Sequence, residues 1–319
     1  MGDLMKQRVV ELTEFGKAEK MKLIEASIPS PGPGQIVVKN NAIGLNYLDT
    51  YFRSGLYPWP NQEKIKIPGS EGVGFVHSVG SDVVELKEGD KVSYVTPVGA
   101  YAEYALINAV HAVEIKVKVN DFDVVACTLK GLTTHYLLHL TFNLKSGMTA
   151  LVHAAAGGVG QLMGQWGSEI GATMIGTVGG PGKAEAAKKA GYHHVIDYND
   201  KDFVTEVMRI TDNKKCDVVY DSVAKSVFPG SMDCLKPRGL WALFGQASGP
   251  IVDFNLGLLS AKGSLFVTRP TLFSYIANRD EYNAASFELY SRVADGRLKV
   301  AIHDKMPIEN IVEAHNLLE

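Results

Sequence analysis

The fold is decided by one stretch of the chain, Leu151-Val152-His153-Ala154-Ala155-Ala156-Gly157-Gly158-Val159-Gly160. It begins as a buried-strand pattern, turns through small residues and continues over 161–170 as an amphipathic helix. Backbone N–H groups at such a helix N-terminus bind phosphate, and side chains larger than alanine would hold a pyrophosphate away. The stretch is therefore a variant, A-x-x-G-x-x-G, of the dinucleotide fingerprint. Its candidate contacts to a dinucleotide are Ala156, Gly157, Gly158 and Val159.

The same stretch heads a series of short apolar runs that alternate with helical segments. This alternation predicts an α/β fold with a Rossmann-type, doubly wound parallel sheet that is buried on both faces. The expected helices include Gly160–Ile170, Lys183–Ala190 and Lys201–Ile210. The expected strands are Thr149–Ala155, Thr173–Val178, His194–Asp197, Asp217–Tyr220, Leu240–Phe244 and Ser264–Thr268.

A different pattern precedes residue 130. Short alternating or β-branched segments are separated by turns rich in proline and glycine, which predicts an antiparallel β-rich domain. The expected strands there are Arg8–Leu12, Gln35–Lys39, Gly72–Val79, Lys91–Thr96 and Tyr101–Ile107.

The segment after Pro270 is too short to form a domain of its own. We expect a helix over Glu281–Asp295 and one more strand over Lys299–His303, both returning to pack on the first domain. The predicted division is therefore residues 1–128 with 270–319 for the β-rich domain, and 129–269 for the Rossmann domain.

The bulk composition limits the functional class. The chain has 319 residues, 46% of them hydrophobic, and a net charge of −3, without the basic excess typical of nucleic-acid binding. Three widely spaced cysteines favour free thiols in a reducing compartment. The N-terminus lacks a secretory signal, and no apolar run approaches the ~20 residues that span a bilayer. We expect a cytoplasmic protein that binds neither nucleic acid nor a membrane.

The residues after the second apolar run favour NADPH over NADH. Sites that prefer NAD carry an acidic residue about 20 positions after the fingerprint, where it holds the ribose hydroxyls. The segment at that place, Thr177-Val178-Gly179-Gly180-Pro181-Gly182-Lys183, contains no carboxylate that would repel a 2′-phosphate. Lys183 supplies a cation, and Tyr198, at the end of the third run, can add a hydroxyl.

No metal site is expected. His135 and His139 are four residues apart on a predicted helix, but Tyr136 stands where a zincin-type site needs glutamate. The neighbouring leucines indicate a packed helix instead. No C-x-x-C pair is present for a structural zinc site.

Several segments in a fixed order make the chain resemble a known family, the zinc-lacking quinone oxidoreductases. These form the zeta-crystallin-like branch of the medium-chain dehydrogenase/reductase superfamily. The resemblance runs from about Val9 to Glu319 and implies a GroES-like catalytic domain beside the Rossmann domain, NADPH as cofactor and a quinone as substrate. Besides the glycine-rich turn, it rests on AIGLNYLDTY (42–51), RSGLYP (53–58), PGSEGVG (68–74), KGLT (130–133), VYDSV (219–223) and VTRP (267–270).

The resemblance also explains why no metal is needed. Zinc-using relatives place a cysteine at the position of Asn46 and a histidine at that of Ser70, and asparagine and serine are poor zinc ligands. A quinone is already electron-poor, so its reduction does not require a Lewis acid. The local pattern places Asn46 in an otherwise apolar strand, where a polar side chain needs a partner.

The resemblance implies roles for individual residues. Asn46, Tyr51 and Thr133 are expected around the nicotinamide, and Tyr51 and Tyr57 along the substrate cleft. Gly158 and Val159 are expected at the pyrophosphate, and Lys183 and Tyr198 at the adenosine phosphate. The remaining expected contacts, along the cofactor groove, are Ser222, Phe244, Gly245 and Thr268.

Two features near the end of the resemblance bear on assembly and on the cofactor. Arg269 is expected either at the interdomain hinge or at a dimer contact. Members of the family continue past the position of Glu319, and an arginine that commonly helps to hold the NADP phosphate is expected beyond it.

These observations leave three hypotheses. In the first, NADPH binds between the two domains of a homodimer and reduces a quinone or a similar conjugated carbonyl, with Gly263–Arg269 pairing with its copy. In the second, the same scaffold reduces enoyl or alkenal double bonds, with Tyr57 as proton donor. In the third, the chain binds NADPH but has a structural or nucleic-acid role. The sequence does not distinguish hydride transfer from single-electron transfer, nor does it name the acceptor.

Overall fold

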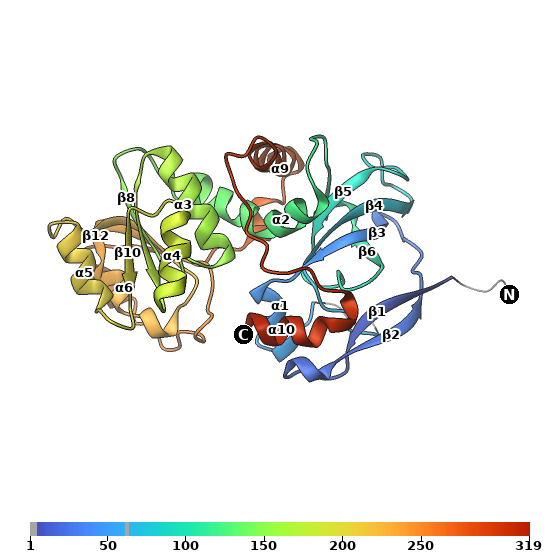
Figure 1. Ribbon diagram of the computed structural model, residues 1–319, viewed down its shortest axis with the longest axis horizontal. Coiled ribbons are helices and arrows are strands. Elements are labelled where there is room, and N and C mark those ends of the chain that lie inside the picture. Colours follow the sequence, from blue (N-terminus) through green and yellow to red (C-terminus); the bar gives the residue numbers. More distant parts are fainter. Residues whose placement is uncertain (1–4, 61–63) are drawn as a thin grey trace. The chain divides into compact units, whose positions relative to one another are not determined.

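A computed structural model describes residues 5–60 and 64–319 (Figure 1). Residues 1–4, at the N-terminus where no secretory signal is expected, lie outside the described residues, as do 61–63. The chain divides into two compact units. Unit 1 comprises Met1–Leu129 with Ile276–Glu319, and unit 2 comprises Lys130–Tyr275. The functional division into residues 1–128 with 270–319 and residues 129–269 remains a prediction.

Unit 2 contains a six-stranded parallel sheet with the strand order β10-β9-β8-β11-β12-β13. Counted from β8, this is the order 3-2-1-4-5-6 of dinucleotide-binding folds, so the predicted doubly wound sheet is confirmed. The order reverses between β8 and β11, and the glycine-rich turn leaves β8 at this point. The strands are β8 (Thr149–Val152), β9 (Thr173–Val178), β10 (His194–Asp197), β11 (Cys216–Asp221), β12 (Leu235–Leu243) and β13 (Phe266–Thr268).

Helices cover both faces of this sheet (Figure 1). On one face, α3 (Gly158–Ile170) and α4 (Pro181–Lys189) pack against each other and against β9 and β10. On the other face, α5 (Phe203–Ile210) and α6 (Gly230–Asp233) pack together over a core that includes Leu151, Val219 and Trp241. Shorter elements complete unit 2: a π-helical segment (Leu137–Thr141), a 3₁₀ turn (Lys225–Val227), α7 (Gly257–Ala261) and α8 (Leu272–Tyr275).

Unit 1 is built on a five-stranded antiparallel sheet with the order β6-β3-β4-β5-β7, which confirms the predicted β-rich domain. Ile36, Val38, Val76 and Tyr94 belong to its buried core. A separate two-stranded sheet precedes it. The strands of unit 1 are β1 (Lys6–Leu12), β2 (Met21–Ser27), β3 (Gln35–Gly44), β4 (Glu71–Val79), β5 (Lys91–Val95), β6 (Tyr104–Asn108) and β7 (Ala112–Glu114).

Unit 1 also contains helices, and one of them crosses its boundary with unit 2. α1 (Tyr47–Ser54) follows β3 directly, and α2 (Asp121–Tyr136) continues through the boundary at Leu129 into unit 2. From the returning segment, α9 (Arg279–Ala294) matches the expected helix, and α10 (Ile311–Leu318) packs its apolar side on the core of the β1–β2 sheet. Three 3₁₀ turns span Ala18–Lys20, Ala109–His111 and Ile308–Asn310.

One expected strand is wrong. In Lys299–His303 the alternate residues Val300 and Ile302 are half-buried, but the segment forms no strand pairing among the described residues. A period of two shows which side chains face the protein; it does not show whether a neighbouring backbone offers hydrogen bonds.

Candidate active site

The glycine-rich turn after β8 brings backbone very close to backbone. Ala154 has a φ of +53°, and the Gly157 N–H donates to Ala154 O over 2.9 Å. A Cβ on Gly160 would lie 2.4 Å from Ala154 O, so only glycine fits there. The N-cap of α3 is Gly157, and among the described residues no side chain caps this helix end. The first amides of α3 are therefore available to an anion, and the turn fits a pyrophosphate.

A residue that the sequence pattern did not identify as a site residue lies beside this turn. A Cβ on Gly158 would be 2.5 Å from Lys130 Cδ and 2.9 Å from Lys130 Cε, so the lysine side chain crosses the start of α3. Thr133 lies three positions further along α2, on the same side of the helix as Lys130, and is 7% exposed. The structure thus places the stem of a lysine side chain beside the amides of the turn. No local motif signals a contact between positions so far apart in the chain.

The other cofactor residues expected in unit 2 follow the carboxyl ends of the strands. A Cβ on Gly245 would lie 2.6 Å from Ser222 O, so the ends of β11 and β12 meet closely there. Thr268 ends β13, and Phe244 follows β12 directly. Arg269 Nη1 donates to Leu243 O at 3.1 Å, at the same edge of the sheet. This edge is where open α/β sheets bind ligands.

The expected site for the adenosine phosphate contains a carboxylate that the loop sequence does not show. Lys183 lies exposed in the first turn of α4, and the Tyr198 hydroxyl would be 2.5 Å from a Cβ on Gly179. Asp197, at the end of β10, accepts the Gly180 N–H through both carboxylate oxygens, at 3.0 and 3.1 Å. The expectation that this place is free of carboxylates holds for the loop after β9 but not for its surroundings in space.

In unit 1, Asn46 is the N-cap of α1 and does not lie in a strand, so that expectation is wrong. The sequence signal is the pair Asn46 and Asp49, which is a capping-box spacing. The Asn46 side-chain Nδ2 donates to Glu71 Oε1 over 2.7 Å, and Asn46 is 4% exposed. The partner that a buried amide requires is therefore a buried carboxylate.

Glu71 is fixed from two further sides. Its Oε2 accepts the Leu129 N–H of α2 over 2.7 Å, and the residue is fully buried. Its register partner on β3 is Gly44, where a Cβ would lie 2.3 Å from Glu71 Oε1. Glycine at 44 thus makes room for the carboxylate that orients the Asn46 amide.

Ser70, the second position where zinc-using relatives have a ligand, also has its polar atom engaged. Its hydroxyl donates to Asp49 Oδ1 at 2.5 Å, while Asp49 Oδ2 accepts the Asn46 N–H at 2.9 Å and the Tyr101 hydroxyl at 2.8 Å. Asp49 is fully buried, and burial raises its pKa to about 6 against the lowering effect of these hydrogen bonds.

This chain of hydrogen bonds continues to α10. His315 Nε2 lies 3.1 Å from the Tyr101 hydroxyl, and His315 Nδ1 lies 3.1 Å from Arg53 Nη1. Because a guanidinium only donates, Nδ1 accepts and the ring proton is assigned to Nε2. Burial and the Arg53 charge lower the pKa of His315 to about 4, so the ring is neutral at neutral pH. Asp49 therefore connects the end of α1 that carries Asn46 to the last helix.

The two expected substrate tyrosines lie together. The rings of Tyr51 and Tyr57 are 5.2 Å apart, and the Tyr57 N–H donates to Tyr51 O at 3.0 Å. Phe52 and Trp59 extend the cluster, with Phe52 5.6 Å from Tyr57 and 6.4 Å from Trp59. Aromatic side chains of α1 and of the loop after it thus form one cluster in unit 1.

The histidine pair His135 and His139 packs against an aromatic ring. The two imidazoles are 5.1 Å apart, and their centroids lie 5.8 and 5.3 Å from that of Trp166. In the part of the chain that the structure describes, no three His, Cys, Asp or Glu side chains gather in a way that could hold a metal ion.

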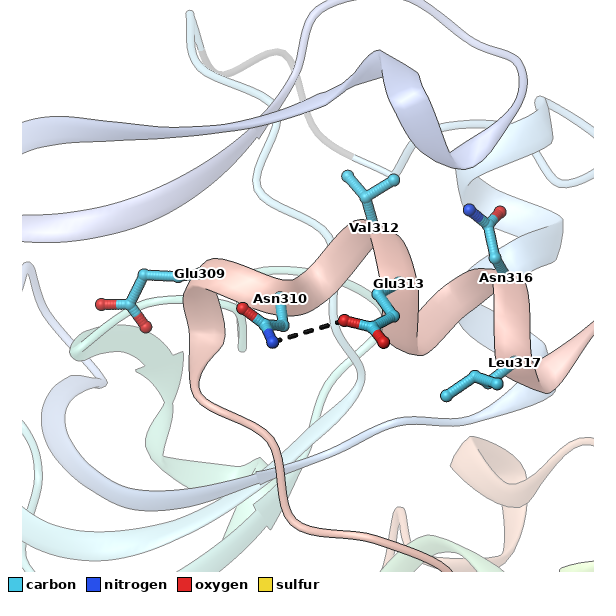
Figure 2. Close-up of a pocket in the computed structure, with 6 residues that line it drawn as sticks. All are labelled: Glu309, Asn310, Val312, Glu313, Asn316 and Leu317. Carbon is cyan, nitrogen blue, oxygen red and sulfur yellow. Dashed lines mark hydrogen bonds between the residues drawn. The ribbon is translucent and has the colours of Figure 1, made fainter.

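Two surface cavities lie away from these residues. The one in Figure 2, of about 490 Å³, is lined by α10 and the 3₁₀ turn before it, with Glu309, Val312 and Glu313 among its residues. The other, of about 550 Å³, lies against α9, with Arg279 and Phe287 in its lining. Neither of these two cavities contains an expected site residue.

Two domain families match parts of this chain and identify its protein class. Residues 32–117 match the alcohol dehydrogenase GroES-like domain, and 158–290 match a family described as zinc-binding dehydrogenase. With the six-stranded sheet, they confirm the expected combination of a GroES-like and a Rossmann-type fold, that of the medium-chain dehydrogenases and reductases. At the two positions where the resemblance implies ligands in zinc-using relatives, this chain has Asn46 and Ser70, which are poor zinc ligands.

The sequence identity to individual relatives shows the family to which the chain belongs. A quinone oxidoreductase of Pseudomonas aeruginosa is 43% identical over 97% of this chain and 95% of its own length. The crystal structure of Escherichia coli quinone oxidoreductase complexed with NADPH has a TM-score of 0.92 and 41% identity, covering 98% of this chain and 96% of the other. A 2-haloacrylate reductase of a Burkholderia species is 41% identical over 92% of this chain and 90% of its own. The chain belongs to the quinone oxidoreductase family, which confirms the resemblance.

None of the helices in the described part of the chain combines the length and the apolar character that crossing a bilayer requires.

The raised pKa of Asp49 predicts how substitution changes stability with pH. A folded-state pKa above the ordinary value gives stability that is present at low pH and lost as the pH rises through about 6. Relative to wild type, Asp49→Asn should therefore gain about 2 kcal/mol in free energy of unfolding between pH ~4.5 and ~8. Urea unfolding at both pH values measures this difference.

The matched control is Asp200→Asn, which removes an exposed carboxylate. Its curve should run parallel to that of wild type. If Asp49→Asn also runs parallel to wild type, the buried carboxylate does not titrate in this range and the description of the network is wrong.

Proposed function

We propose that this protein is an NADPH-dependent quinone oxidoreductase that works without a metal. The family membership supports the reaction, and one observation carries the metal-free chemistry. At the place where zinc-using relatives hold their metal, the polar atoms of Asn46 and Ser70 are hydrogen-bonded to the buried carboxylates of Glu71 and Asp49. An amide and a hydroxyl bound in this way are poor zinc ligands.

The glycine-rich turn supports the cofactor. NADPH, when bound, supplies the hydride. The free amides of α3 and the Lys130 side chain would hold the pyrophosphate, because both present hydrogen-bond donors or positive charge to it. Ala156, Gly157, Gly158 and Val159 form this cradle. We assign the sides of the groove to Ser222, Phe244, Gly245 and Thr268, and the adenosine phosphate to Lys183 and Tyr198.

Asn46 has a defined part in the reduction. We place it at the nicotinamide and the substrate with Tyr51, Tyr57 and Thr133. An amide NH₂ has two hydrogens, and the bond to Glu71 uses one of them. The other can donate to a quinone oxygen, which gains negative charge as the ring accepts the hydride. A proton from water then completes the hydroquinone, so no buried acid has to be consumed.

The direct test is NADPH oxidation with 1,4-benzoquinone or 9,10-phenanthrenequinone in the presence of EDTA. We expect turnover that the chelator leaves unchanged within about 2-fold, because no step needs a metal. The control is the same assay after dialysis against zinc. Absence of turnover on every quinone, or its loss on chelation, would overturn the proposal.

Double-bond reduction is a second candidate, and one observation favours it: the 2-haloacrylate reductase resembles this chain nearly as closely as the quinone oxidoreductases do. In that case Tyr57 would have to protonate a substrate carbon. In quinone reduction the proton goes to oxygen, which exchanges it with water.

The two candidates differ in the effect of Tyr57→Phe. For a quinone we expect turnover within about 3-fold of wild type, whereas protonation by Tyr57 predicts a loss of about 10²-fold or more on a trans-2-enoyl thioester. Tyr47→Phe, in the same aromatic cluster, is the control. Faster wild-type turnover on the thioester than on any quinone, together with that loss, would reverse the order of the candidates.

Two finer assignments complete the proposal. We place the protein in the cytoplasm, which is supported by three buried cysteines, none of which forms a disulfide. We also propose a homodimer formed through β13. This strand ends the sheet of unit 2, and its Phe266 and Val267 are 61% and 36% exposed, as expected of an edge that pairs with a copy.

A further inference from the structure

We infer that Asp197 sets the cofactor preference: its carboxylate weakens binding of the 2′-phosphate, so the enzyme uses NADH as well as NADPH. This inference rests on the proposed function, because it concerns the adenosine end of the same cofactor site. It differs from what the loop sequence alone predicts, since no carboxylate stands between Thr177 and Lys183.

The position of Asp197 follows from the sheet. Asp197 ends β10 and is the register partner of Val178, which ends β9. In dinucleotide folds the end of the second strand is the place where the ribose hydroxyls or the 2′-phosphate are recognised. Here β9 is that second strand. Its neighbour β10 ends in Asp197, so the Asp197 carboxylate lies beside the recognition site.

The carboxylate is held in place by backbone amides. Both oxygens accept the Gly180 N–H, at 3.0 and 3.1 Å, and Oδ1 also accepts the Asn199 N–H at 3.1 Å. Gly180 has a φ of +104°, a conformation that other residues rarely adopt. The loop can therefore follow this path and present the Gly180 N–H to Asp197 only because residue 180 is glycine. The Asp197 side chain is half-buried, and these hydrogen bonds hold its carboxylate beside the loop.

The cationic and hydroxyl groups expected to hold the phosphate share this loop. The Tyr198 hydroxyl lies over Gly179, and Lys183 is in the first turn of α4, whose N-cap is Gly180. A 2′-phosphate brings nearly two negative charges and would meet the Asp197 charge beside its own ligands. The 2′-hydroxyl of NADH carries no charge and can donate to a carboxylate. The net effect is reduced discrimination between the two cofactors.

Substitutions at Asp197 can remove its negative charge while keeping a hydrogen-bond acceptor for the Gly180 N–H. In Asp197→Asn the amide oxygen can still accept the Gly180 N–H, so the loop is retained while the charge is removed. Asp197→Ser also removes the charge and keeps an acceptor, and it serves if the asparagine variant does not fold. Asp200→Asn changes an exposed carboxylate of the same loop and is the matched control.

The experiment is titration calorimetry of the full chain with adenosine 2′,5′-bisphosphate and with 5′-ADP, which lacks the 2′-phosphate. We expect Asp197→Asn to bind the bisphosphate about 5- to 20-fold more tightly than wild type and 5′-ADP within about 2-fold. The gain should shrink in about 1 M salt, where charges are screened beyond ~3 Å. The ratio of kcat/KM for NADPH to that for NADH should rise by a similar factor. Asp200→Asn should change neither quantity by more than about 2-fold.

Unchanged or weaker binding of the bisphosphate by the Asn and Ser variants, with wild type still oxidising NADPH, would overturn the inference and leave the proposed function standing. The inference would also be overturned if Asp197→Asn and Asp200→Asn raised the affinity for the bisphosphate equally. The change would then reflect the net charge of the protein and not the position of Asp197. If wild type binds neither nucleotide and oxidises neither cofactor, the proposed function itself fails.

Discussion

The interaction on which the rest of the site depends is the 2.7 Å hydrogen bond from the Asn46 amide to the buried Glu71 carboxylate. A buried carboxylate is costly unless its oxygens are satisfied, and here Asn46 and the Leu129 N–H satisfy them. Space for the carboxylate exists only because Gly44 has no side chain. The strand β3, the helix α1 and the middle of α2 therefore converge on one acidic group. In this arrangement the neutral Asn46 amide is held in one orientation by a buried carboxylate.

In unit 2, too, carboxylates at the ends of strands accept hydrogen bonds and hold neighbouring groups in place. The buried Asp221 accepts the Val223 and Ala224 N–H groups at 2.8 and 2.9 Å and the Trp241 indole N–H at 3.0 Å, which shapes the turn that carries Ser222. Asp197 does the same for Gly180. Each carboxylate fixes a loop at the edge where a cofactor would bind, and the glycine-rich turn leaves its own amides to the ligand. Acidic side chains thus shape the loops at the edge where we propose that an anionic cofactor binds, and for Asp197 we infer an effect on cofactor selectivity.

The sequence predicts the architecture well because periodicity and chain order determine it. Alternating runs after residue 148 fix a doubly wound sheet, and the strands β9 and β10 begin and end at the expected residues. What it could not supply are contacts between distant positions, such as Glu71 with Asn46, Lys130 with Gly158, and Asp197 with Gly180. The apolar neighbours of Asn46 predict a strand, whereas its spacing to Asp49 indicates the helix cap that the structure shows. Lys299–His303 alternates like a strand but pairs with no strand among the described residues.

The central claim, that Glu71 acts through the Asn46 amide, is tested most directly by a double-mutant cycle on kcat/KM for 1,4-benzoquinone with EDTA present. Asn46→Ala and Glu71→Gln should each lower kcat/KM by about 10- to 100-fold, and the double variant should lose little more than the worse single one. Circular dichroism and unfolding of all four proteins control for folding. Losses that multiply in the double variant would contradict the account, because the two residues would then act independently.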